Sequence, residues 1–189
     1  MTEITITGRD LKASIADVLP VMKNSRKHLM ETIAKALVIS DGRRVKFQAT
    51  DRFIVVESQF YERGENDDAL PEFGFLVDIP SVEALKTVGM TGRVTVTAEG
   101  FDSGRINVPA EDAEGWPALH KFMDETWNDP NYFERGDDGG LVSDAFRPEL
   151  VKHIKDVLIL PRRNGVGRPS RIYAKDRVRG VIMPTREQG

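Results

Sequence analysis

A carboxylate, a guanidinium and an aromatic ring follow one another in segment 49–53, as Asp51, Arg52 and Phe53. Acid–base catalysis, ligand binding and a polar turn all use such residues. Asp51 could act as the acid or base of a hydrolase. An aspartate at a turn is far more often structural, however, because its side chain accepts hydrogen bonds from the nearby backbone. A hydrolase that uses Asp51 is therefore the weakest of three hypotheses for this chain.

The other residue types give catalysis and metal binding no firmer basis. The chain has no cysteine, which excludes thiol catalysis, thiolate metal sites and disulfides. Its three histidines, His28, His120 and His153, do not stand at metal-ligand spacing from one another. The sequence contains no nucleophile elbow, phosphate loop or dinucleotide fingerprint. We therefore predict no catalytic residue, no metal, no cofactor and no enzymatic activity.

Charge is distributed unevenly along the 189 residues, although the net charge is only −3. Residues 99–140 carry eleven Asp and Glu against three Lys and Arg, whereas residues 141–189 carry eleven Lys and Arg against five Asp and Glu. This asymmetry indicates either a polyanionic partner that touches one face or an unevenly charged solvated surface. No apolar run approaches the length of a membrane span, so we expect a soluble, cytoplasmic protein.

The elements that would position segment 49–53 follow from hydrophobic spacing and turn signals. Asp10 is expected to cap the first helix, and Pro20 to kink or close it. Gly42 and its neighbours predict a hairpin turn. Strands are expected at 2–7, 36–39, 45–49, 53–60, 73–79, 94–98, 104–108, 170–174 and 178–183, and helices at 11–22, 80–88 and 148–158. Residues 1–60 and 72–110 thus repeat the order strand, helix, strands.

Basic residues accompany the three expected helices. If these helices line one surface, that surface would bind phosphates without reading bases. Taken alone, the pattern is better explained by lysines that solvate helices. The aromatic residues of the acidic stretch 110–140 are expected to pack a connector, because acidic surroundings repel phosphates. The candidate DNA-facing residues are Lys12, Lys23, Arg26, Lys27, Lys86, Lys152, Lys155, Arg162 and Arg163.

Several segments together resemble the bacterial DNA polymerase sliding clamp, or β clamp. "LVISDGRRVKFQATDRFIVV" resembles a strand pair of the middle clamp domain, and "RVRGVIMPTR" resembles the terminal strand of the last domain. "DIPSVEALKTV", "INVPAEDAEGWPAL" and "FRPELVKHIKDVL" resemble further clamp segments in the same order. The resemblance predicts a full clamp-like domain at 1–120, an acidic connector at 121–140 and a partial domain, a helix plus two strands, at 141–189. A shortened clamp encoded by a phage or plasmid would have this size, and would work in the host cytoplasm.

The resemblance implies an α+β DNA-clamp fold, in which repeated strand–helix–strands units place helices on one face of an antiparallel sheet. Clamps of this family encircle duplex DNA as closed rings without sequence-specific contacts. DNA polymerase and the clamp loader bind them through short peptides. In this chain Thr185 replaces an apolar pocket residue of the family, and 54–56 replaces its "RLA". The partner-peptide pocket implied here comprises Thr50, Arg52, Phe53, Ile54, Val181, Met183, Pro184 and Thr185.

Two hypotheses follow from the resemblance. The first is a processivity factor that forms a homo-oligomeric ring around DNA and tethers replication proteins. Family rings present twelve helices to DNA, so three helices per chain suggest four subunits, whereas a fourth helix within 110–140 suggests three. The second hypothesis is a clamp-like module that binds clamp-interacting peptides without encircling DNA, and diverts or recruits replication proteins.

Overall fold

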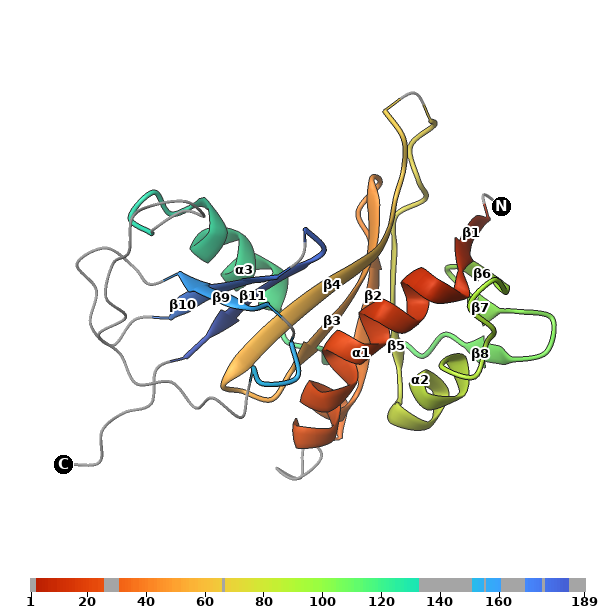
Figure 1. Cartoon of the computed structure of the whole chain (residues 1–189), viewed down its shortest axis with the longest axis horizontal. Helices are drawn as coiled ribbons and strands as arrows, with labels where there is room; N and C mark the ends of the chain where they lie inside the picture. The colour runs from red at the N-terminus through yellow and green to blue at the C-terminus, as the bar shows by residue number, and fades with distance from the viewer. Residues whose placement is uncertain are drawn as a thin grey trace.

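Two antiparallel sheets and three α-helices make up the part of the chain that the computed structural model describes, residues 3–25, 31–65, 67–132, 151–154, 156–160, 169–174 and 176–183 (Figure 1). One sheet has the strand order β1-β6-β7-β8, and the other has the order β5-β2-β3-β4-β11-β10-β9. The predicted α+β class is confirmed. The strands are β1 (Ile4–Thr7), β2 (Ala36–Ser40), β3 (Arg44–Thr50), β4 (Ile54–Glu62), β5 (Phe73–Val77), β6 (Arg93–Thr97), β7 (Gly100–Asp102), β8 (Asn107–Pro109), β9 (Leu158–Leu160), β10 (Ser170–Ala174) and β11 (Val178–Ile182).

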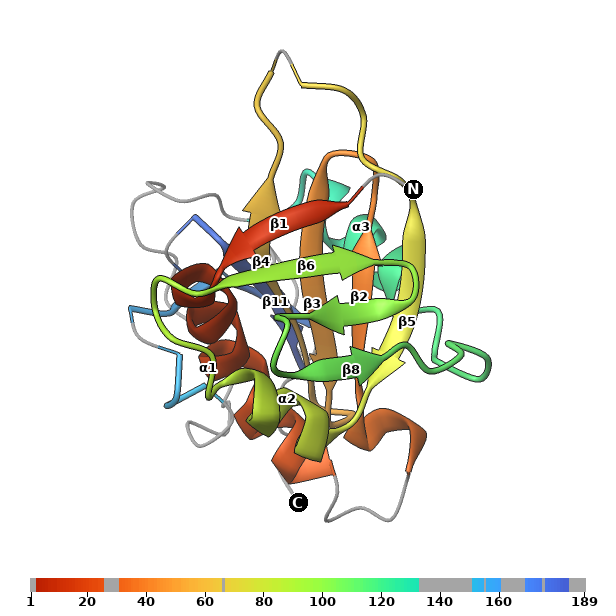
Figure 2. The same ribbon diagram turned by 90° about the vertical axis from the view of Figure 1, so that its right-hand side faces the viewer.

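The first 110 residues consist of two similar units that exchange their first strands. The first unit runs β1, α1 (Gly8–Ser25), β2, β3, β4, and the second runs β5, α2 (Ile79–Leu85), β6, β7, β8. Strand β1 pairs with β6 of the second unit, and β5 pairs with β2 of the first. Figure 2 shows the four-stranded sheet facing the viewer, with α1 and α2 close together beside it. The exchange ties the two units together.

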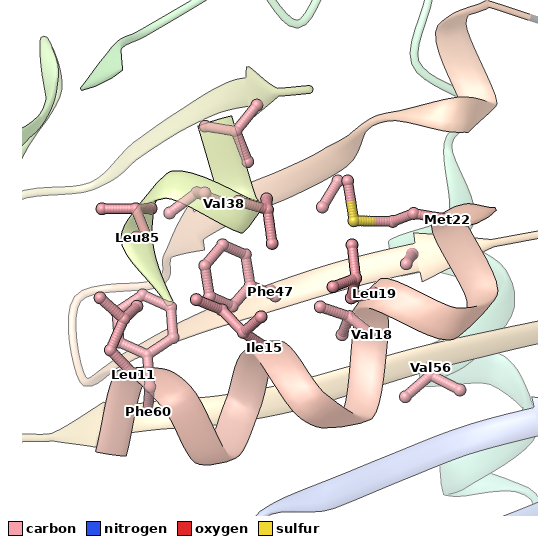
Figure 3. Packing of buried hydrophobic residues seen from close by; sticks show 14 of the residues in the cluster. Leu11, Ile15, Val18, Leu19, Met22, Val38, Phe47, Val56, Phe60 and Leu85 are labelled. Carbon is pink, nitrogen blue, oxygen red and sulfur yellow. The ribbon is translucent and has the colours of Figure 1, made fainter. Parts of the chain in front are cut away.

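Helix α1 buries one long apolar stripe against the sheets. Leu11, Ile15, Val18, Leu19 and Met22 recur at helical spacing and belong to one core cluster with residues of strands β2, β3 and β4 and helix α2 (Figure 3). The helix begins earlier than the spacing predicted. The hydroxyl of Thr7 accepts a hydrogen bond from the Asp10 N–H at 3.2 Å and donates to the Asp10 carboxylate at 2.6 Å. Thr7 therefore caps the helix, and Asp10 is its partner one turn in.

Two further local predictions differ from the structure. Helix α1 does not close at Pro20 but continues to Ser25, whose hydroxyl donates to the Met22 and Ile33 carbonyls. The strand expected at 104–108 is instead the shorter β8 at 107–109, and the unpredicted strand β7 lies between it and β6. Gly100 begins β7 with a φ of 126°, and a Cβ there would lie 2.0 Å from the Val108 carbonyl oxygen. A glycine is needed for this close approach of β7 to β8.

The connector and the C-terminal part differ most from the prediction. Helix α3 (Leu119–Asn128) occupies much of the expected acidic connector. The helix expected at 148–158 is wrong over its described part: residues 151–154 form turns, Asp156 has a φ of 58°, and Leu158 begins strand β9. A left-handed residue stops a helix, and the apolar run that follows it extends as a strand. Residues 148–150 and 155 lie outside the described residues.

Candidate partner-peptide site and helix surface

The segment that links β3 to β4 is a turn held by its own polar side chains. The Asp51 carboxylate accepts hydrogen bonds from the backbone N–H groups of Phe53 and Ile54, both at 3.0 Å, and from the Asn24 side chain of α1. The Thr50 hydroxyl donates to the Ile54 carbonyl at 2.9 Å and accepts from the Arg52 N–H. Asp51 is 1 % exposed. A carboxylate occupied in this way is structural, which argues against a hydrolase.

This turn is adjacent to the C-terminal strand, although more than 100 residues separate the two in the sequence. Strand β11 pairs antiparallel with β4, from Val178 opposite Ser58 to Ile182 opposite Ile54. The pairing continues with a hydrogen bond from the Met183 N–H to the Phe53 carbonyl at 2.8 Å. We call this β4–β11 pairing the seam. It brings segment 50–54 next to 181–183, the described parts of the two segments that the resemblance assigned to one pocket.

The seam requires a glycine at one position. Gly180 lies opposite Val56, and a Cβ on it would lie 2.4 Å from the Val55 carbonyl oxygen and 2.7 Å from the Ile172 side chain. Contacts that short do not occur, so any side chain at position 180 forces strand β11 away from β4 or β10. The glycine therefore sets how closely the C-terminal strands approach the first unit.

The candidate pocket residues divide between the two faces of the sheet. Ile54 packs in the main core beneath α1, and Phe53 packs against the same core. Val55 and Val181 lie opposite each other on the other face. Because side chains alternate along a strand, Ile54 and Val55 cannot face the same ligand. We call the face that carries Val55 and Val181 the outer face. Arg52 and Met183 are exposed, and Pro184 and Thr185 lie outside the described residues.

Helix α3 covers the outer face of the seam. Its residue Met123 is fully buried against Val55 and Val181, while Leu119, Phe122 and Trp127 are partly buried around them. Helix α1 packs on the opposite face of the same strands, so the sheet lies between the two helices. In Figure 1, α1 runs along β3 and β4, and α3 lies next to β10 and β11. Helices α1 and α2 lie on one face of the sheet as expected, whereas α3 lies on the other face.

A buried arginine holds the C-terminal end of α3. Arg171 of β10 donates from Nε to the Thr126 carbonyl at 2.9 Å and from Nη2 to the Asp129 carbonyl at 2.6 Å. Its guanidinium also stacks on the rings of Tyr132 and Trp127, 4.4 and 5.5 Å from their centroids. The last carbonyls of a helix lack partners within it and carry partial negative charge. Arg171 therefore caps α3 from the strand beneath it.

Charged side chains cross the seam on the outer face beside α3. Glu57 of β4 is 2 % exposed and accepts from Arg179 of β11 at 2.6 Å and from Gln48 at 2.7 Å. Lys46 pairs with Glu57 at 3.3 Å, and Asp124 of α3 pairs with Arg179 at 3.4 Å. Burial lowers the pKa of Arg179, but the Glu57 carboxylate outweighs it, so the net pKa is raised and the charge is kept. These pairs line a groove of about 870 Å³.

A second polar cluster joins α1 to the C-terminal part on the opposite face. Asp17 of α1 is 4 % exposed, accepts from Ser58 at 2.8 Å and pairs with Arg177 at 2.9 Å. His153 Nε2 lies 3.0 Å from the Asp17 carbonyl oxygen. Burial lowers the pKa of His153 despite the raising effects of this carbonyl and of the Asp17 charge. A neutral His153 donates to that carbonyl, which fixes Nε2 as its protonated nitrogen.

The described candidate DNA-facing residues lie on the side of the molecule that carries α1 and α2. Lys12 is half-buried on α1, and Lys86 is exposed after α2. Lys23 forms an ion pair with Glu83 of α2 at 2.6 Å, with both side chains about half exposed. Lys152 is exposed next to His153, which contacts α1. We call this the helix surface. Arg26, Lys27, Lys155, Arg162 and Arg163 lie outside the described residues.

The sequence predicts a helix within 110–140 only as an alternative, and it predicts neither the bounds of α3 nor its contribution to the seam. Leu119, Phe122, Met123 and Trp127 recur at the spacing of a helix face, which was the available signal. The surrounding Gly, Pro and acidic residues indicated a connector instead. Ala118 at the N-cap makes no side-chain hydrogen bond, so no capping signal marked the start of the helix.

Comparison with known proteins identifies the fold through structure alone. No family model and no curated protein matches the sequence. Among solved structures, a chain described as a DNA polymerase III beta subunit from Eubacterium rectale aligns over 100% of this chain and 66% of its own length, with a TM-score of 0.73 and 9% identity. The DNA polymerase sliding clamp from Bacillus subtilis aligns over 99% of this chain and 65% of its own, with a TM-score of 0.67 and 14% identity.

These matches give the class of the protein: the chain has the DNA sliding-clamp fold, as its sequence segments predicted. A DNA polymerase III beta subunit from Thermotoga maritima aligns similarly, over 96% of this chain and 64% of its own, with a TM-score of 0.65 and 14% identity. The chain therefore spans about two thirds of the length of these clamps. Within the described residues, no helix is long and apolar enough to cross a membrane, and no group of His, Asp and Glu could hold a metal ion.

Proposed function

We propose that the protein is a sliding-clamp-type processivity factor that encircles duplex DNA as a homo-oligomeric ring and tethers DNA polymerase and a clamp loader through short peptides. The seam is the observation that carries the proposal. It unites segment 50–55 with Val181 and Met183, so the fold retains the junction at which the resemblance places the peptide pocket. Tethering raises the effective concentration of a partner on DNA and requires no catalysis.

The pocket assignment is refined by the two faces of the sheet. Val181 and exposed Met183 are the apolar contacts we assign to a partner peptide, together with Thr50, which precedes the turn, and Val55, which faces Val181. Exposed Arg52 would lie at the rim. Ile54 and Phe53 support the turn from the core side. Met183→Ala should weaken peptide binding and leave DNA retention unchanged.

The helix surface is proposed to face DNA. Lys12, Lys86 and Lys152 supply ammonium groups there, which suit non-specific contact with phosphates. Lys152→Ala combined with Lys155→Ala should weaken DNA retention and flatten its dependence on salt. Lys121→Ala is the matched control, because exposed Lys121 lies on α3, which covers the opposite face of the sheet. Equal retention by both variants would contradict the assignment.

A second candidate, the clamp-like module that does not encircle DNA, is favoured by the free edge of β8. The Ala110 N–H donates to the carbonyl of Glu99, the residue before β7. Backbone groups alternate in direction along a strand, so those of Asn107 and Pro109 point to the free edge. Pro109 has no N–H to donate there. Proline at such a position discourages strand addition. Strand β4, which pairs with a terminal strand at the seam, is already occupied by β11. The first feature disfavours strand addition at β8, and the second leaves β4 no free edge for a strand of another copy.

Retention on DNA of different topology decides between the two candidates. A ring should remain on nicked circular DNA at a salt concentration that disrupts phosphate contacts, and should leave after the circle is linearised. A module should bind peptides and show the same retention on circular and linear DNA. A strict monomer at micromolar concentration, with and without DNA, would refute the ring. Helix α3 lies away from the helix surface, so it adds no DNA-facing helix to the count.

A further inference from the structure

Met123 of α3 fills the apolar position on the outer face of the seam. Its side chain has no exposed area and packs between Val55 of β4 and Val181 of β11. These valines are only 6 % and 1 % exposed, so α3 rather than solvent covers them. An apolar anchor of a partner peptide that used the outer face of the seam would need the same two valines. Two side chains cannot occupy this space at once.

We infer that Met123 is the specificity-determining residue of the partner site, and that α3 and the partner peptide compete for the seam. The inference rests on the proposed peptide-binding function. It adds that the site is filled by the chain itself in the absence of a partner. Only a peptide whose anchor replaces the contacts of Met123 with Val55 and Val181 displaces α3.

The construction of α3 suits displacement from its N-terminal end. Ala118 provides no side-chain cap, and Leu119 and Phe122 are only partly buried. The C-terminal end is held by Arg171 through two carbonyls and by its stacking on Trp127 and Tyr132. Lifting the first turns of α3 breaks the 3.4 Å pair between Asp124 and Arg179, while the helix stays attached at Arg171. A helix of ten residues has little stability of its own away from a packing surface.

The displaced side chain defines the chemistry of the partner. Methionine is flexible and adapts to an irregular apolar gap, so its best substitutes are leucine and methionine. Val55 and Val181 offer no polar group to an anchor, so burying a charged or amide side chain against them costs free energy. The expected ligand is thus a short peptide with a Leu or Met anchor. A β-branched or aromatic anchor should bind more weakly because its shape differs from the space that Met123 leaves.

Fluorescence anisotropy with a panel of six-residue labelled peptides tests the competition. Each peptide carries Leu, Met, Val, Phe or Ser at one anchor position in a Gly-Ser background. Met123→Ala removes the competitor and should bind the Leu and Met peptides about tenfold more tightly than the wild type, the factor expected for one buried apolar side chain. Met123→Leu keeps a competitor of similar volume and should match the wild type, as should Lys121→Ala on the exposed side of α3. Equal or weaker binding by Met123→Ala would overturn the inference.

A second measurement separates this inference from the proposed function. The chain has no cysteine, so Val55→Cys introduces a unique thiol at the seam. Its reaction with a maleimide should be slow, at least tenfold faster when combined with Met123→Ala, and slow again when the Leu peptide is added. Equal rates with and without Met123→Ala would refute the cover by Met123. Faster labelling with no protection by any peptide would refute the proposed function instead. If Met123→Ala does not fold, Arg171→Lys can replace it, because it loosens α3 from the other end. It should likewise tighten binding of the Leu and Met peptides and speed maleimide labelling of Val55→Cys.

Discussion

Replacing Arg171 by alanine should destabilise the protein more than any change on the solvent side of α3. The side chain is 6 % exposed, donates two hydrogen bonds to α3 carbonyls and stacks on two rings. Each hydrogen bond from a charged donor contributes about 1.5–3 kcal/mol, and the stacking about 1–2 kcal/mol. The desolvation of the guanidinium offsets several kcal/mol of this sum. We expect a net loss of about 2–4 kcal/mol in the free energy of unfolding.

Urea unfolding followed by tryptophan fluorescence measures this loss, since Trp127 lies directly against Arg171. For a slope of about 2–3 kcal/mol per molar urea, the midpoint should fall by about 1 M. Arg171→Lys keeps the charge but loses the planar fork, so it should lose roughly half as much. Lys121→Ala removes only an exposed pair with Glu125 at 3.9 Å and should shift the midpoint by less than about 0.2 M. An Arg171→Ala midpoint within about 0.2 M of the wild type would refute the capping role of Arg171.

Three further predictions address the seam, its pH dependence and the helix surface. Gly180→Ala should separate β11 from β4, because its Cβ would lie 2.4 Å from the Val55 carbonyl oxygen; amide hydrogen exchange in both strands should rise sharply, and unchanged protection would contradict this packing. The folded pKa of His153 is lowered from 6.5, so the unfolded state binds its proton first and stability should fall as pH drops below about 6.5. The urea midpoints at pH 7.5 and pH 5 should therefore differ less in His153→Gln than in the wild type. An equal difference in both proteins would refute the assignment. Glu83→Gln should release Lys23, tighten DNA binding about two- to fivefold and steepen its salt dependence; weaker binding would argue against DNA contact at this surface.

The sequence predicted a local element best where the chemistry of single residues determines its conformation. Asp41 and Gly42 predicted the β2–β3 hairpin: the Asp41 carboxylate accepts from the Arg44 N–H at 2.8 Å, and Gly42 has a φ of 82°. The apolar spacing on α1 predicted its buried face, although Thr7 rather than Asp10 caps it. These features depend on residues a few positions apart, which a sequence displays directly.

The missed features depend on contacts between distant residues or on ambiguous patterns. Nothing local indicates that β4 pairs with β11, and the resemblance to clamps supplied that expectation. The apolar run before Pro161 fits a helix or a strand equally well, and it forms β9. Whether Ile54 or Val55 faces the outer side depends on a shift of one residue in register. Helix α3 is stable because Arg171 and the seam hold it, and neither lies near it in the sequence.

The central claim, that the seam binds partner peptides, is tested most directly by methyl NMR. A protein labelled at valine and methionine methyl groups is titrated with a peptide that carries a leucine anchor. The account predicts that the methyl signals of Val55, Val181, Met123 and Met183 shift with a common affinity, and that Val18 and Val38 in the main core do not. Absence of any shift at millimolar peptide, or shifts confined to residues outside the seam, would contradict it.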